Sequence, residues 1–169
     1  MNVTEETLNS WSRGPSKTES DKCDNAERLV RKAIKASKDL GEQDISVFSQ
    51  GSYKARTNVK QNSDVDICIR YNSAFFPYYP AGTNHQTFGN TTNSLSFAEF
   101  KNMVGRALTE YFGKDGVTRG NKAFDVHANT YRIDADVVPT LEYRHYTGAK
   151  DNYGDGIYIS GVAFNSDNG

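Results

Sequence analysis

The segment GSYKARTNVKQNSDVDICIRY, residues 51–71, decides the fold that we predict for this chain. A strand is expected to lead into a turn at Gly51 and Ser52, followed by a polar loop and a second strand that carries Asp64 and Asp66. Because side chains of a strand point alternately to opposite faces, the two acids project from one face while their apolar neighbours enter the core. The sequence therefore places two carboxylates side by side.

The two carboxylates and the upstream turn together predict a nucleotide site. Neighbouring carboxylates repel each other, and Mg²⁺ is the natural cation to bind between them because it prefers oxygen ligands and keeps positions open for phosphate oxygens. A bare D-x-D pair is also common at solvated strand ends, so the turn matters. Gly51 lets the backbone approach a ligand closely and Ser52 adds a hydroxyl donor, which together suit a triphosphate.

These motifs resemble those of the DNA polymerase beta-type nucleotidyltransferases, in which a glycine-serine turn precedes a strand with two metal-binding acids. The longer match is FSQGSYKARTNVKQNSDVDICI, residues 48–69, with GPSKTESDK at 14–22. It resembles the CD-NTases, bacterial relatives of cyclic GMP-AMP synthase and oligoadenylate synthetase in anti-phage signalling systems (CBASS). The resemblance covers about residues 11–164. It implies an α+β fold, a polymerase beta-like core with a mixed, twisted sheet flanked by helices.

A third acid is expected from TYRIDADVVPTLEYRHY, residues 130–146. Asp134 and Asp136 share one face of the predicted strand, so alternation alone allows either to be the further ligand of a two-metal site. The resemblance favours Asp136, because the family's third acid precedes two apolar residues and a proline. Pro139 is expected to end this strand. The predicted catalytic and metal-binding residues, which would hold two Mg²⁺ or Mn²⁺ ions, are Asp64, Asp66 and Asp136.

Composition indicates one folded domain that works inside the cell. The chain has 169 residues, of which 36% are hydrophobic and 24% charged, enough to bury a core. A net charge of −1 offers no polycation for long nucleic acid. Two cysteines, Cys23 and Cys68, give no disulfide framework, and there is no long apolar run for a membrane. We therefore predict a cytoplasmic, soluble protein without a membrane partner.

The remaining pattern predicts the order of the elements. Residues 1–15 are expected to be a flexible lead-in and 16–169 the catalytic core. A first helix is expected from Ser16 to Gly41, and a second begins at a cap of Ser94 or Ser96 and ends at Gly113. Between them, residues 72–94 are predicted to be mostly irregular. The other strands are expected at 45–48, around 117, at 124–127, at 141–146 and at 157–164.

Several other polar residues are candidates for further ligands. Lys54, Arg56 and Lys60 follow the glycine-serine turn and could steady phosphate charge, although loop cations are commonly just solvated. Cys68 is interpreted as a small packing residue, since no partners at zinc-ligand spacing accompany it. His127 is interpreted as a structural histidine.

The resemblance also implies a reaction. A ribose hydroxyl would attack the alpha phosphorus of a nucleoside triphosphate such as ATP, and closure of the product would give a cyclic di- or trinucleotide second messenger. A regulatory protein partner, and an effector reached through the product, belong to the same expectation. Two alternatives stay open: nucleotide transfer to a protein, tRNA or small molecule, and nucleotide binding without catalysis. Relatives continue past the point of Gly169 into a helical lobe, so a core without that C-terminal lobe is expected.

Overall fold

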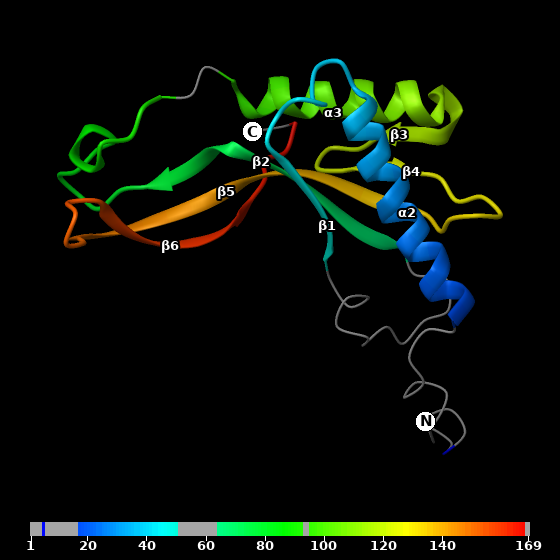
Figure 1. The fold of residues 1–169 in the computed structure, drawn as a ribbon, viewed down its shortest axis with the longest axis horizontal. Coiled ribbons are helices and arrows are strands. Elements are labelled where there is room, and N and C mark those ends of the chain that lie inside the picture. The colour runs from blue at the N-terminus through cyan, green and yellow to red at the C-terminus, as the bar shows by residue number, and fades with distance from the viewer. Residues whose placement is uncertain (1–4, 6–16, 51–63, 93–94, 168–169) are drawn as a thin grey trace.

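The computed structural model describes residues 5, 17–50, 64–92 and 95–167 (Figure 1). The long helices in this part of the chain are α2 (Lys17–Ala36) and α3 (Phe97–Phe112). Short 3₁₀ turns occupy Gln86–Phe88 and Lys114–Gly116. The strands are β1 (Ile45–Gln50), β2 (Val65–Tyr78), β3 (Val117–Arg119), β4 (Phe124–Val126), β5 (Ala135–Lys150) and β6 (Gly156–Ala163).

All six strands form one mixed sheet, which confirms the predicted α+β class. The strand order is β1-β2-β5-β4-β3, and β6 also pairs with β5. β2 and β5 run parallel, whereas the other neighbours are antiparallel. β2 pairs along one edge of β5. The other edge of β5 is shared by two strands: β4 pairs with residues 135–137 of β5, and β6 pairs with residues 141–150. β5 is therefore the central strand of the fold.

The two helices cover one face of the sheet, where the core lies (Figure 1). The apolar stripe predicted for the first helix is buried in α2, namely Cys23, Ala26, Val30, Ala33 and Ile34. Odd-numbered residues of β2 up to Tyr71 and of β5 up to Leu141 point toward the same core, and Ile67, Ile69 and Val137 are each fully buried. The even-numbered residues at the beginning of β2 and β5 consequently face away from the helices.

Local capping chemistry fixes the limits of α3 as predicted. The Ser96 hydroxyl accepts a hydrogen bond from the Glu99 backbone N–H, and the Glu99 carboxylate accepts one from the Ser96 N–H at 2.8 Å, which is a complete capping box. Gly113 follows the last helical residue with φ at +84°, and its N–H donates to the Thr109 carbonyl. Ser94, the other predicted cap, lies outside the described residues.

The prediction that Pro139 ends a strand is wrong. β5 continues from Ala135 to Lys150, and Pro139 stands opposite Ile69 in the parallel pairing with β2. On the other edge of β5, the β4 ladder stops at residue 137 and the β6 ladder starts at 141. A proline, which has no N–H to donate, is tolerated where one neighbouring ladder is interrupted.

Two further boundaries differ from the prediction. The segment expected to be irregular from residue 72 is strand up to Tyr78, because β2 resumes its pairing with β5 after a register shift between Tyr71 and Phe75. The first helix ends at Ala36 rather than Gly41, and the Gly41 N–H then closes a turn on the Ser37 carbonyl at 2.8 Å. Both differences come from pairing or turns that the local pattern does not encode.

Candidate active site

Three carboxylates lie in a row across neighbouring strands, on the sheet face that the helices leave uncovered. Asp66 of β2 is in register with Asp136 of β5, and Asp136 is in register with Asp125 of β4. Asp66 and Asp125 are exposed, whereas Asp136 is half-buried between them. Since adjacent strands are about 4.8 Å apart, these side chains are immediate neighbours. We call Asp66, Asp136 and Asp125 the acid row.

Asp64 lies beside the acid row, one residue before β2 begins. The Val65 N–H donates to the Asp134 carbonyl at 3.1 Å, so the entries to β2 and β5 are tied together at this point. Asp134 itself precedes β5, and its carboxylate accepts a hydrogen bond from the Ala128 backbone N–H. Asp134 is thus engaged in shaping the turn before β5, which favours Asp136 as the third ligand.

Two carboxylates of this site, Asp64 and Asp136, have a raised pKa. Burial is the largest cause of the raised pKa of Asp136, followed by the charges of Asp64, Asp66 and Asp125. The pKa of Asp64 is raised by burial and then by the charges of Asp134, Asp125 and Asp66. Within the described residues, no ion pair neutralises Asp64, Asp66 or Asp136. The described part of the chain therefore concentrates negative charge here without a neutralising cation of its own.

This charge fits a hard divalent cation in its chemistry. The donors are carboxylate oxygens, which Mg²⁺ and Mn²⁺ prefer. As they stand, no three His, Cys, Asp or Glu side chains in the described ranges converge closely enough to bind one ion. A bound ion would have to draw the carboxylates of the adjoining strands together, which their freedom at an exposed face permits.

The predicted glycine-serine turn lies outside the described residues, as do Lys54, Arg56 and Lys60. The residue that leads into this turn, however, is described. β1 ends at Gln50, which is in register with Asp66 of β2. The last described residue before the turn therefore lies beside the acid row, and the role of Gly51 and Ser52 with phosphate stays a prediction.

Sequence reasoning missed Asp125. The alternation of Phe124, Asp125 and Val126, with both apolar residues buried, is the same signal that exposed the D-x-D pair. Nearby, His127 Nε2 lies 2.8 Å from the Thr118 hydroxyl and 3.7 Å from the Asp125 carboxylate. The interpretation of His127 as structural agrees with these contacts.

Cys68 follows Asp66 on the same face of β2 and is buried. Burial, with a contribution from the charge of Asp66, raises the pKa of the Cys68 thiol to about 11. A thiol that stays protonated at neutral pH is neither a good metal ligand nor a good nucleophile. The interpretation of Cys68 as a packing residue agrees with this environment.

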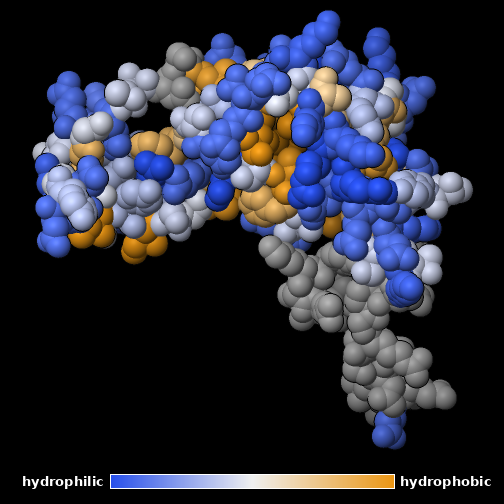
Figure 2. Space-filling model, viewed as in Figure 1, coloured by the Kyte–Doolittle hydropathy of each residue, from blue (hydrophilic) through white to orange (hydrophobic). Residues whose placement is uncertain are grey.

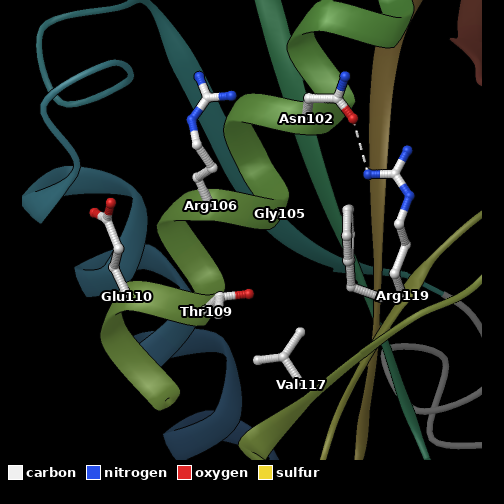
Figure 3. A pocket seen from close by; sticks show the side chains of 8 residues that line it. Asn102, Gly105, Arg106, Thr109, Glu110, Val117 and Arg119 are labelled. Atoms are coloured by element: carbon white, nitrogen blue, oxygen red, sulfur yellow. Dashed lines mark hydrogen bonds between the residues drawn. The ribbon is translucent and has the colours of Figure 1, made fainter. Parts of the chain in front are cut away.

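A hollow of about 510 Å³ lies on the helical side of the sheet, between α3 and β3 (Figure 3). Arg119 crosses its wall and donates to the Asn102 side chain at 2.9 Å, and it also pairs with Asp167 at 3.1 Å. Arg106 pairs with Asp39 at 2.6 Å. Both arginines are thus engaged with the protein itself, and the sheet separates this hollow from the acid row.

Comparisons with known proteins give close relatives along the whole chain. No family model matches the sequence. A cyclic dipyrimidine nucleotide synthase CdnE of Legionella pneumophila is 44% identical over 167 residues, which cover 98% of this chain and 55% of the relative. No described helix has the length and hydropathy to cross a bilayer.

Solved structures show the same fold. The Rhodothermus marinus CdnE c-UMP-AMP synthase, with Apcpp and Upnpp, superposes with a TM-score of 0.77 at 33% identity, over 95% of this chain and 52% of that one. The Elizabethkingia meningoseptica CdnE cyclic dinucleotide synthase, with GTP and Apcpp, gives 0.70 at 33% identity, over 99% and 53%. The chain therefore spans about half the length of the relatives it matches.

Proposed function

Since this chain belongs to the CD-NTase family, we propose that it is the nucleotidyl-transfer core of a cyclic nucleotide synthase. The observation that carries the proposal is the register of Asp66 with Asp136, beside the point where β1 delivers the chain to Gly51. The two synthases with solved structures named above share this fold, and both are bound to nucleotides or nucleotide analogues. The substrates would be nucleoside triphosphates, and the activity would be cytoplasmic.

The proposed ligands of two Mg²⁺ ions are Asp64, Asp66 and Asp136. When bound, the metal would activate the attacking ribose hydroxyl and neutralise charge on the triphosphate. Gly51 and Ser52 would hold the beta and gamma phosphates, which orients the alpha phosphorus toward the incoming hydroxyl. Asp136 would also help to draw off the hydroxyl proton. Attack by the hydroxyl of a second nucleotide would break the bond between the alpha and beta phosphates and release pyrophosphate, and closure by the same chemistry would give a cyclic di- or trinucleotide for anti-phage signalling.

Binding and turnover should be measured separately on this chain. Calorimetry should show that ATP binds in the presence of Mg²⁺, and the double variant Asp64→Asn, Asp66→Asn should lose at least about tenfold in affinity while keeping its fold. Asp24→Asn is a matched control, because Asp24 is an exposed acid on α2. Equal Mg²⁺-dependent binding by all three proteins would refute the proposed site.

Product analysis then distinguishes the proposed reaction from the alternatives. The chain is incubated with all four nucleoside triphosphates and Mg²⁺, and cyclic products are sought by mass spectrometry. A cyclic product formed from nucleotides alone supports the synthase. Binding without any product, followed by labelling of an added protein or RNA acceptor, would instead support transfer to that acceptor.

A further inference from the structure

One edge of the sheet carries exposed apolar side chains that no described element covers. β6 pairs only with β5, and Figure 2 shows hydrophobic side chains along its margin, at the lower left. In the part of the chain that the structure describes, most of the large exposed hydrophobic residues belong to or adjoin this hairpin. We define the β6 strip as Ile157, Tyr158, Ile159 and Val162, which are 45%, 37%, 68% and 40% exposed.

The sheet edges at β1 and β3 differ from this one. At β1, Arg31 of α2 donates to the Val47 carbonyl at 2.7 Å, and Glu27 accepts from the Ser49 N–H at 3.1 Å. β3 is only three residues long. Among the described residues, no side chain of another element than β5 hydrogen bonds to the backbone of β6. A long, unprotected apolar edge is a template for pairing with another strand.

The composition of β6 favours a second copy of itself as that partner. Its sequence, GIYISGVA at 156–163, contains no charged residue and no proline, the two usual blocks to edge pairing. Two such strands can approach without like-charge repulsion. The chain's net charge of −1 opposes self-association only weakly.

The ends of β6 are complementary in charge when two copies run antiparallel. Asp155 precedes the strand, and beyond its other end the Lys122 ammonium lies 5.8 Å from the centre of the Phe164 ring. Neither Asp155 nor Lys122 has an ion-pair partner among the described residues. A two-fold axis brings the acidic end of each strand beside the basic end of its partner, twice.

We propose that this chain forms a two-fold dimer by antiparallel pairing of β6 with β6. When two copies of a strand pair antiparallel within one continuous sheet, the two-fold axis is perpendicular to the sheet. A given residue then points to the same face in both copies, so an even-numbered residue stands opposite an even-numbered one and an odd-numbered residue opposite an odd-numbered one. The pairing centred on Ser160 opposes Tyr158 to Val162 of the partner subunit. An aromatic residue against a β-branched one is a favourable cross-strand pair, and symmetry provides it twice. The sheet then continues through both subunits.

Solution mass tests the proposal. Sedimentation or light scattering over roughly 1 to 100 µM should show a monomer–dimer equilibrium with a micromolar Kd. Ile159→Lys should raise the dissociation constant at least about tenfold, because the substitution enters the two-fold interface twice. Tyr111→Lys is the control, since Tyr111 is 41% exposed on α3. Near-ultraviolet circular dichroism of each variant verifies the fold.

A cross-link tests the register independently. In the proposed pairing, Ser160→Cys faces its own copy with Cα atoms about 5 Å apart, within disulfide range. It should form a covalent dimer on mild oxidation, whereas Lys32→Cys on α2 should not; the native Cys23 and Cys68 are buried and will not interfere. A strictly monomeric wild type, or a dimer that Ile159→Lys leaves intact, would overturn the proposal.

Discussion

Replacing Asp136 by asparagine should stabilise the ion-free protein and remove its response to Mg²⁺. Asp136 stands between Asp66 and Asp125 on adjacent strands. Unit charges about 5 Å apart repel by about 0.8 kcal/mol in water and more in a lower dielectric. Because the outer two acids are exposed, solvent limits the total relief to about 1 to 2 kcal/mol. For a domain of this size that corresponds to a rise in Tm of roughly 3 to 6 °C.

The measurement is thermal or urea unfolding in EDTA and in Mg²⁺. Wild type should gain about 2.7 kcal/mol at a Mg²⁺ concentration one hundred times its dissociation constant, whereas Asp136→Asn should gain much less. Asp24→Asn on α2 is the matched control, with neither effect expected. If Asp136→Asn is less stable than wild type in EDTA, or keeps the full Mg²⁺ response, the acid row is not a cation site of the kind described.

The difference in stability between wild type and Asp136→Asn should also depend on pH. Asp136 has a raised pKa in the folded protein, so in the window above the ordinary carboxyl pKa the native state holds more protons than the unfolded chain. The stability that this group contributes is complete below the ordinary pKa and is lost as the pH rises through the raised value. The stabilisation by Asp136→Asn in EDTA should therefore be largest near neutral pH and should disappear in acid. A difference that grows toward acid pH would contradict the assignment.

Three further substitutions test the packing that supports the site. Gly105→Ala should lower the free energy of unfolding despite the better helix propensity of alanine, because the new Cβ would lie 2.8 Å from the Phe124 ring; a rise in Tm would contradict this contact. Ser96→Ala should cost about 1 kcal/mol in urea unfolding by removing the capping box with Glu99, whereas an exposed mid-helix alanine substitution should not. Lys101→Met should lower the free energy of unfolding by about 1 to 3 kcal/mol, because the buried ammonium donates to the Gly120 and Asn121 carbonyls, which would lose this donor. Unchanged urea unfolding would contradict this role of Lys101.

Local chemistry could be read from the sequence, and it was sufficient for much of the fold. Ser96 and Gly113 mark the limits of α3 through caps that involve residues only a few positions away. Asp64 and Asp66 share a face because strand alternation is a property of the chain itself. The resemblance to the CD-NTases contributed two further predictions, Asp136 and the family itself, because the motif of that family combines residues from separate strands.

Features that depend on the pairing of distant segments could not be read in the same way. Asp125 joins the acid row only because β4 pairs with β5 in one register. Pro139 is compatible with a continuous strand because two ladders happen to leave a gap beside it. The aromatic segment up to Tyr78 becomes strand because β5 extends far enough to pair with it. Each outcome was decided by a partner that lies elsewhere in the chain.

The uninterrupted course of β5 has a mechanical consequence. This strand has sixteen residues and measures about 50 Å at 3.3 Å per residue. Asp136 lies near the beginning of this strand, and the later residues 141–150 form the hairpin with β6. The pairing with β6 is irregular only between Tyr146 and Lys150, where Gly148 has a φ of +87°. A tilt imposed on the hairpin at or before Tyr146 would therefore be conveyed along β5 to the spacing of the carboxylates.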